Sequence, residues 1–359
     1  MLTRFLKFPW QVQGSDPHWV PPLLFDQRNL FSPKHPFHQH AVVKSFLAVD
    51  DRDCVTGRIC AIVNRAHNEF WKDRVGFFGF FECVRDQEVA HALIEAAASF
   101  LRDQGMDVMR GPMNFSTNEE CGLLVDGFDT PPAVMMTHNP PYYADLIQAE
   151  GFAKEKDLLA YEMHEGELSE RVRTIGRKLE ERLAIRFRTF NAKDFRGEVE
   201  RFKLVYNSAW EENWGFVPMT DAEIDVMAAG LKTVLDARLI QFAETDDGRT
   251  VGFILGLPDL NVIFKKLNGK LFPFGIIRLL LNKHKTGRAR ILAMGVLPEF
   301  RKKGIDTVLY LRAYEAGTSV GYGWGEFSWV LEDNEMMNSA AQSMGSKPYK
   351  RWRIYDRKL

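Results

Sequence analysis

Apolar and polar positions divide the first half of the chain into alternating strand-like and helix-like segments. The clearest helix is 87–105, because apolar residues recur every three to four positions from Val89 to Leu101 and Gly105 follows. The predicted order is strands at 44–49, 56–64 and 75–84, this helix, a strand at 106–113, a helix at 140–152 and a strand at 157–163. Residues 1–40 are rich in Pro, His and aromatic residues and show little periodicity, which predicts an extended arm packed on this half.

The second half repeats this order after an amphipathic helix at 168–183. It predicts helices at 201–210 and 221–235, a hairpin at 238–258, a strand at 288–298, a helix at 304–317, a strand at 325–332, a helix at 334–345 and a strand at 350–359. Hairpin, strand, helix, strand, helix and strand therefore occur twice, without obvious identity between the copies. We expect an α/β (α+β) protein of two units, 1–166 and 167–359, each a mixed, mostly antiparallel sheet flanked by helices.

Composition agrees with two domains and narrows the class of partner. A chain of 359 residues with 45% hydrophobic content can bury two cores, and 27 Phe with 8 Trp favour large cores or apolar pockets. The 47 basic and 48 acidic residues nearly cancel, so no overall field favours nucleic acid, and we expect no nucleic-acid partner.

Cysteine usage and the N-terminal residues favour a cytoplasmic protein. All four cysteines lie in the first half and form no CxxC pair, which is typical of reduced thiols (Cys54, Cys60, Cys83, Cys121). The first residues lack the apolar core of a signal peptide and are broken by Pro9, and no run reaches the ~20 apolar residues that span a bilayer. Pro36 interrupts a cluster of His35, His38 and His40, and we expect no metal there.

A basic turn after the strand at 288–298 is the strongest local sign of chemistry. The strand ends at Pro298, the turn reads Arg301-Lys302-Lys303-Gly304, and a helix begins at once. Such a turn directs backbone N–H groups outward at the positive end of the helix dipole, and the cations add to that charge. Gly304 also lets the backbone approach a ligand closely. The turn is therefore suited to a multiply charged anion such as a pyrophosphate.

Here the sequence resembles the GNAT acyltransferase superfamily, whose cofactor motif is a strand, then [Q/R]-x-x-G-x-[G/A], then a helix. Arg301 and Gly304 match the first two fixed positions. Asp306 replaces the usual small residue, and its carboxylate would repel a pyrophosphate unless it turned away, for instance to cap the helix. The resemblance covers Leu239–Tyr355 well and covers the first half by element order and by residues 139–152.

A second match supports the resemblance. The superfamily commonly has an Asn eleven residues before the Gly that ends the next helix, and Asn334 lies eleven before Gly345. Ala341 stands where a Tyr usually protonates the leaving thiolate, so Tyr349, or Tyr355, is a candidate substitute. The resemblance implies two GNAT-like units, acyl-CoA or acetyl-CoA as co-substrate and no metal. The expected cofactor residues are Met294, Gly295, Val296, Arg301, Lys302, Lys303, Gly304, Ile305, Asp306 and Asn334.

The first half has no such motif at the equivalent place. Residues 111–122 lack basic side chains and contain Glu119 and Glu120, so we expect this unit to have lost cofactor binding and its loop to hold substrate. The candidate substrate residues are Asn118, Glu119, Asn139, Tyr143, Trp214 and Phe216. Turn formation and capping in the first half, and core packing of the two aromatic residues after 210, are the alternatives.

Acyl transfer to an amine needs a base for the amine and a donor for the oxyanion. On the strand at 325–332, Glu326, Ser328 and Glu332 fall on one face by the period of two. We select Glu326 as the base, Glu332 as the second candidate and Tyr349 as the acid. The alternative is that both carboxylates are structural or face solvent.

An insertion at 260–287 separates two strands that a minimal GNAT unit joins by a short connection. Residues 260–298 contain no acid but eight Lys and Arg among many apolar residues, which predicts a basic helical hairpin. Such a hairpin fits an interfacial segment, with 260–290 on an anionic membrane, or a lid over an acyl chain. It also fits a helix pair that packs internally and leaves a basic face in solvent.

Together these features predict an acyl-CoA-dependent N-acyltransferase that acts on a primary amine by direct attack. The apolar insertion and aromatic content resemble in kind the bacterial ceramide synthases, soluble-looking enzymes that acylate a lipid amine such as a sphingoid base. Acetylation of a small polar amine is one alternative. A non-catalytic acyl-CoA-binding protein is another, and Asp306 and Ala341 favour it. We expect a cytoplasmic protein with peripheral contact at the inner membrane, and the sequence predicts no oligomeric state.

Overall fold

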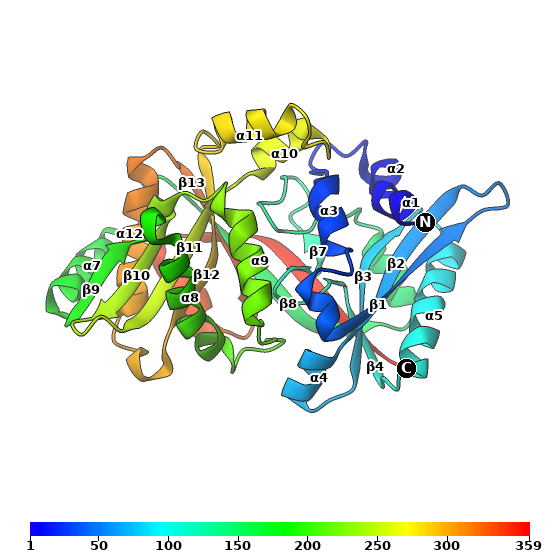
Figure 1. The fold of residues 1–359 in the computed structure, drawn as a ribbon, viewed down its shortest axis with the longest axis horizontal. Coiled ribbons are helices and arrows are strands. Elements are labelled where there is room, and N and C mark those ends of the chain that lie inside the picture. Colours follow the sequence, from blue (N-terminus) through cyan, green and yellow to red (C-terminus); the bar gives the residue numbers. More distant parts are fainter.

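One twelve-stranded sheet runs through the computed structural model, which describes residues 1–359 (Figure 1). Its strands lie in the order β1 (Ala41–Val49), β2 (Val55–Asn64), β3 (Val75–Cys83), β4 (Val108–Gly111), β14 (Lys347–Lys358), β8 (Ala153–His164), β13 (Trp324–Leu331), β12 (Arg288–Val296), β11 (Thr250–Pro258), β10 (Ile240–Thr245) and β9 (Ile185–Thr189). β7 (Leu123–Asp126) pairs with β14, and β5 (Met113–Asn114) pairs with β6 (Glu120–Cys121) in a separate ribbon. The expected mixed α/β class is confirmed.

The two halves exchange strands at the middle of this sheet. β8 comes from the first half but pairs with β13 of the second, from Trp324 opposite His164 to Leu331 opposite Leu158. β14 comes from the second half but pairs with β4 and β7 of the first, and it also pairs with β8. Hydrogen bonds therefore cross the boundary expected near residue 166 in both directions.

Helices cover both faces of the sheet and occur at most of the predicted places. They are α1 (Leu2–Lys7), α2 (Pro9–Gln13), α3 (Leu24–Leu30), η1 (Pro36–Gln39), α4 (Arg65–Trp71), α5 (Gln87–Asp103), α6 (Tyr143–Ala149), α7 (Glu170–Arg182), η2 (Ala192–Asp194), α8 (Phe195–Trp210), α9 (Asp221–Lys232), η3 (Ala237–Leu239), α10 (Asn261–Leu267), α11 (Gly275–Asn282), η4 (Pro298–Phe300), α12 (Ile305–Ser319) and α13 (Glu335–Met344). The extended arm expected at 1–40 is wrong, since short helices there bury Phe5, Leu6 and Phe37 in the first half's core.

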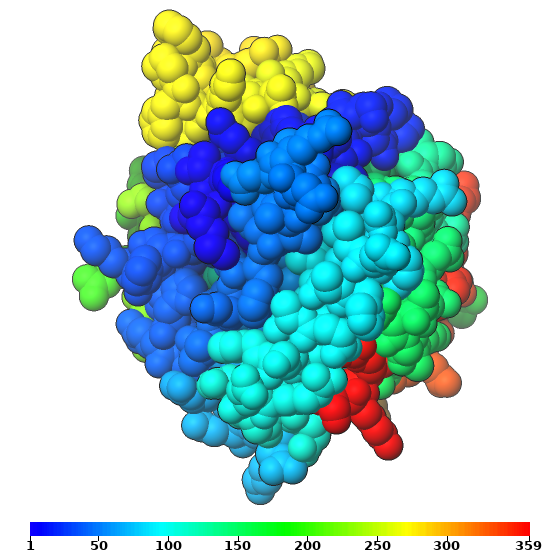
Figure 2. All heavy atoms as spheres, turned by 90° about the vertical axis from the view of Figure 1, so that its right-hand side faces the viewer, coloured from blue at the N-terminus to red at the C-terminus, as the bar shows by residue number.

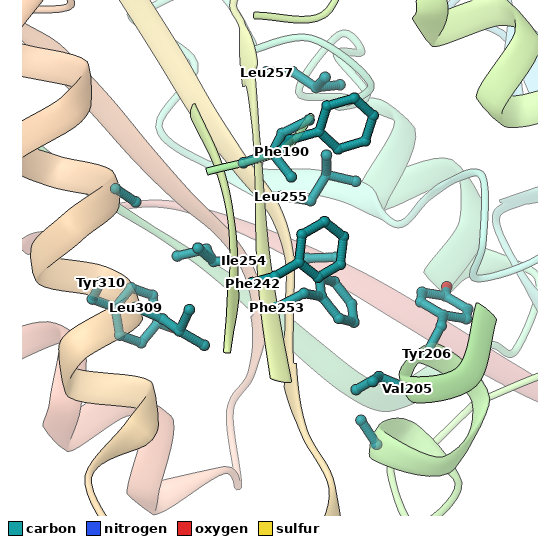
Figure 3. Packing of buried hydrophobic residues seen from close by; sticks show 14 of the residues in the cluster. Phe190, Val205, Tyr206, Phe242, Phe253, Ile254, Leu255, Leu257, Leu309 and Tyr310 are labelled. Atoms are coloured by element: carbon teal, nitrogen blue, oxygen red, sulfur yellow. The ribbon is translucent and has the colours of Figure 1, made fainter. Parts of the chain in front are cut away.

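The core of the second half lies on both faces of the sheet strands β10 and β11 (Figure 3). Phe253 and Leu255 lie on the face covered by α8, whereas Ile254 lies on the face covered by α12, as the period of a strand requires. Leu309 and Tyr310 of α12 complete the second face. These two layers fix the strands β11 and β12 that frame the site described below.

The insertion forms the helical hairpin that its sequence predicts. α10 and α11 pack on each other above the end of β11 and bury Ile263, Leu267 and Leu279. No helix of the structure combines the length and the apolar character that crossing a bilayer requires. All four cysteines are free thiols, and only Cys54 is exposed.

Candidate functional site

The site begins where strands β12 and β13 separate. These parallel strands pair only from Arg288 opposite Trp324 to Ile291 opposite Phe327, and beyond this point they diverge. On the other side of β12, Leu255 opposes Ala293 and Gly256 opposes Ile291, so Leu292 is an extra, bulged residue. The edge of β12 beyond Ile291 that faces β13 therefore has no strand partner.

A cavity of about 240 Å³ occupies this opening. Its walls come from both halves of the chain and include eight of the ten predicted cofactor residues and three of the six predicted substrate residues. The predicted residues that line it are Met294, Gly295, Val296, Arg301, Lys302, Ile305, Asp306, Asn334, Asn118, Trp214 and Phe216. Segments that the sequence analysis selected separately therefore lie around one cavity.

One end of the cavity is formed by the basic turn after Pro298. None of the six backbone N–H groups from Lys302 to Thr307 has an acceptor within the protein. Lys302 (φ 61°) and Gly304 (φ 84°) both adopt the left-handed conformation, which turns successive amides to one side. These amides lie at the start of α12, so the helix dipole adds to their positive potential. The turn can bind an anion.

Arg301 and Gly304, which the sequence analysis assigns to anion binding, make contacts within the protein instead. Arg301 donates from Nη2 to the carbonyl oxygen of Ala209 at 2.9 Å and pairs with Glu212 at 3.0 Å, which ties the end of α8 to the turn. A Cβ atom on Gly304 would lie 2.6 Å from Cδ1 of Leu179 on α7. The glycine is thus required by its left-handed backbone and by helix packing.

Asp306 and Asn334 lie at the N-terminal ends of two helices, α12 and α13. Asn334 caps α13 by accepting a hydrogen bond from the N–H of Met337 at 3.1 Å. The suggestion that Asp306 caps α12 is wrong, because that helix has no side-chain cap. One turn further along α12, the hydroxyl of Tyr310 is buried without a partner, and burial, with Asp306 nearby, raises its pKa well above the usual value.

A second, smaller cavity of about 70 Å³ adjoins the first and contains Glu119. The two cavities share the lining residues Thr117, Asn118, Trp210, Leu292, Ala293 and Trp329. The Glu119 carboxylate forms no hydrogen bond or ion pair with the protein, although the Asn118 side chain next to it is bonded to Tyr206 at 2.9 Å. Burial, then the charges of Glu120 and Glu223, raise the pKa of Glu119 to about 8. A carboxyl group with this pKa is suited to proton transfer near neutral pH.

A third space of about 50 Å³ adjoins the second between α8, α9 and the sheet. It shares Phe202, Met227 and Leu255 with the second cavity, and all but one of its lining residues are hydrophobic. Their shared walls place the three spaces in a row, with the basic turn at one end, Glu119 in the middle space and an apolar interior at the other end.

Glu326 and Tyr349 lie together outside the first cavity. The Tyr349 hydroxyl donates to Glu326, which also accepts from Ser328 and faces Arg290 at 3.6 Å. Burial, with the Glu326 charge second, raises the pKa of Tyr349. Because Arg290 lines the second cavity and Ser328 the first, this buried cluster supports the walls of both.

Three other candidates lie away from the cavities. β13 ends at Leu331, and Glu332 instead pairs with Lys154 at 2.6 Å at the surface. Asn139 accepts the N–H of Leu124 at 2.7 Å, and the Tyr143 hydroxyl donates to buried Glu82 at 2.7 Å. The polar groups of Asn139 and Tyr143 are therefore used inside the first half, a structural role that differs from the turn formation and capping named as their alternative.

No protein-family model matches the sequence. The chain is 37% identical over 369 residues to the bacterial ceramide synthase of Caulobacter vibrioides (strain NA1000 / CB15N), covering all of this chain and 95% of that protein. It is 35% identical over 366 residues to protein YghO of Escherichia coli (strain K12), covering all of this chain and 93% of YghO. The chain belongs to the protein family of these two relatives. A tandem GNAT protein from the clavulanic acid biosynthesis pathway shares its fold, at a TM-score of 0.59 and 12% identity over 99% of this chain and 94% of that one.

This member of the bacterial ceramide synthase family therefore has the tandem GNAT fold and is an acyltransferase. Arg290 is one of the eight cations counted in 260–298, but it lies on β12 beyond the insertion, is buried and donates to the carbonyl oxygen of Val134 at 2.7 Å. Its place inside the apolar strand run 288–298 is the signal that separates it from the exposed cations, because a charge in a buried strand needs partners.

Proposed function

We propose that this protein transfers a long acyl chain from acyl-CoA to the primary amine of a lipid, such as a sphingoid base. The observation that carries the proposal is the row of three neighbouring spaces, which places an anion-binding turn, an unpaired carboxylate and an apolar interior next to one another. The family relationship to a bacterial ceramide synthase supports the same class of acceptor.

The donor would occupy the second unit, residues 167–359. The free amides from Lys302 to Thr307 and the Lys302 side chain suit the diphosphate of coenzyme A, and the opening between β12 and β13 suits its extended arm. Asp306 is tolerated in this arrangement if the phosphates contact the amides rather than the carboxylate. In the first unit, the equivalent turn holds Glu119 and Glu120, so we propose that it binds no donor.

The acceptor amine would lie in the second cavity, where Glu119 accepts its proton. An ammonium ion beside Glu119 would find a carboxylate with no competing partner. A pKa of about 8 lies nearer to the value of about 10 for a primary ammonium than the pKa of an ordinary carboxyl group does, so proton transfer costs less free energy. The oxyanion that forms on the thioester carbonyl needs a fixed donor. We expect a backbone N–H near the bulge at Leu292, because the edge of β12 facing the opening is unpaired there.

The apolar third space is the reason to favour a long chain over an acetyl group. Each methylene buried there contributes about 0.8 kcal/mol, so a long chain gains binding free energy that a two-carbon acyl group does not. A lipid acceptor also lies in a membrane, so this function predicts a cytoplasmic protein that reaches the inner membrane surface.

The test is release of free coenzyme A from acyl-CoA donors of increasing chain length, with a long-chain amine or a small polar amine as acceptor. We expect turnover only with long donors and the lipid amine, and the amide product is confirmed by mass spectrometry. Turnover with acetyl-CoA and the polar amine alone would instead show a small-molecule acetyltransferase. Tight donor binding without release in any combination would show a non-catalytic binding protein.

A further inference from the structure

The α10–α11 hairpin exposes a contiguous apolar surface that no part of the chain covers. Its exposed residues are Phe272, Phe274, Ile277, Leu280 and Leu281, and Phe25 of α3 joins them through a ring contact of 5.4 Å with Phe272. Phe274, in the loop before α11, is 78% exposed and Leu281 on α11 is 67% exposed, which are high values for large apolar side chains. Figure 2 shows this hairpin standing out from the rest of the molecule. We call these six residues the hairpin surface.

The hairpin itself carries cations and no acids, and the nearby acids in other segments include Asp26, next to Phe25, and Asp236, which pairs with His284. Residues 260–298 contain no Asp or Glu. None of the hairpin's cations forms an ion pair with the protein (Lys265, Lys266, Lys270, Arg278, Lys283, Lys285). Lys265 and Lys283 donate to the carbonyl oxygens of Pro17 and Thr233, which leaves their charges without a carboxylate partner. Apolar residues at the centre of a cationic rim are complementary to an anionic bilayer, in which the headgroups carry negative charge and the interior is apolar.

The hairpin is held firmly on its other side. Ile263, Leu267 and Leu279 are buried, the Trp10 indole donates to the side chain of Asn268 at 2.6 Å, and the N–H of Leu24 donates to the carbonyl oxygen of Gly269 at 3.1 Å. The hairpin surface is thus the unpartnered half of an element whose other half is already packed. This arrangement fits a fixed docking platform better than a lid that opens and closes.

The hairpin and the donor turn lie at opposite ends of one strand (Figure 1). β12 begins at Arg288, just after the hairpin, and ends at Val296, just before the basic turn. With a rise of about 3.3 Å per residue, the bulge at Leu292 lies about 13 Å from each end. A lipid tail that enters from the hairpin side and a water-soluble donor that enters from the turn side would therefore meet near the bulge.

We propose that the hairpin surface docks the protein on an anionic lipid bilayer, with the hairpin end of β12 facing the membrane. The docking proposal rests on the proposed function in one respect, which is the reason for docking: access to a lipid amine. The docking itself follows from the exposed apolar residues and the unpaired cations. A second copy of the chain is the other occupant that an apolar surface could take, and the experiment separates the two.

The test is vesicle flotation with full-length protein and two kinds of vesicle, phosphatidylglycerol mixed with phosphatidylcholine, and phosphatidylcholine alone. We expect binding to the mixed vesicles, weaker binding at high salt and little binding to phosphatidylcholine. The double variant Phe274→Glu with Leu281→Glu should lose about tenfold or more in affinity. Arg278→Glu should lose about fivefold or more, since each cation near an anionic surface contributes about that factor.

Leu204→Glu on α8 is the matched control, because Leu204 is 69% exposed and lies far from the hairpin in sequence and on a different helix. It should bind vesicles as the wild type does. Equal binding by the control and the double variant, or no preference for phosphatidylglycerol, would overturn the proposal. So would light scattering that shows a dimer which only the double variant dissociates, because the surface would then be an interface between copies.

The outcome is separable from that of the acyl-transfer assay. Neither Phe274 nor Leu281 lines any of the three spaces, so the double variant should release coenzyme A at the wild-type rate with detergent-dispersed amine. Normal release with lost vesicle binding supports docking, whereas vesicle binding without any release would leave docking intact and refute the proposed function.

Discussion

Replacing Glu119 by Gln removes one carboxyl group from the second cavity while keeping its size. In the folded protein, burial raises the pKa of this group to about 8, whereas in the unfolded chain it keeps an ordinary value near 4.5. Between these two values the folded protein holds a proton that the unfolded chain has lost. Folding is then coupled to proton uptake, so the stability of the wild type falls as the pH rises through this range.

The magnitude follows from the size of the shift. Each unit of pKa difference corresponds to about 1.4 kcal/mol, which gives an upper limit of about 5 kcal/mol between pH 4.5 and 8. Glu119→Gln has no proton to exchange, so it should lose less stability over this interval than the wild type. In catalysis, loss of a general base costs about 10²- to 10⁴-fold in rate, and the wild-type rate should rise with pH until about pH 8.

Urea unfolding at several pH values and the rate of coenzyme A release measure the two effects separately. Glu181→Gln, an exposed substitution on α7 without an ion pair, is the control and should match the wild type in both. A parallel pH dependence of stability for Glu119→Gln and the wild type would refute a buried, proton-holding carboxyl group. A changed stability profile with an unchanged rate would refute only its role as base.

Two further substitutions test the framework of the site. Gly304→Ala forces a Cβ to within 2.6 Å of Leu179 in a left-handed conformation, so chemical unfolding should show a loss of about 1–3 kcal/mol. Arg290→Met leaves Glu326 buried without its cation and should cost about 3–5 kcal/mol, most of which Arg290→Met with Glu326→Leu should recover in the same measurement. A double variant that recovers none of the lost stability would contradict this account of the ion pair. So would a loss below 1 kcal/mol for Arg290→Met alone.

Local patterns in the sequence were sufficient for most of the elements and for the basic turn that borders the first cavity. The 3.6-residue period located α5 and α12, and the strand, basic turn and helix around Arg301 were placed correctly, because each depends on neighbours in the chain. The same holds for the hairpin at 260–287, where a period of apolar residues separates two short helices.

The second cavity depends on contacts that no local pattern contains. Glu119 and Trp210 both line it although 91 positions separate them, and the raised pKa of Glu119 results from burial that only the assembled halves provide. The role of Arg301 could not be inferred from the sequence either, because its guanidinium donates to a carbonyl oxygen on another helix. Tyr143 has a hydroxyl group suited to binding, but it is buried in a core of the first half, away from the three cavities.

The exchange of β8 and β14 has a consequence for how the molecule is made. β14 is synthesised about 180 residues after β8, which at 5–20 residues per second means a delay of roughly 10 to 40 s. During that interval β4 and β8 both present an open edge where β14 will later lie, and such edges invite pairing with other chains. The nascent protein is therefore expected to depend on chaperones until its final strand arrives, and neither half should fold properly when expressed without the other.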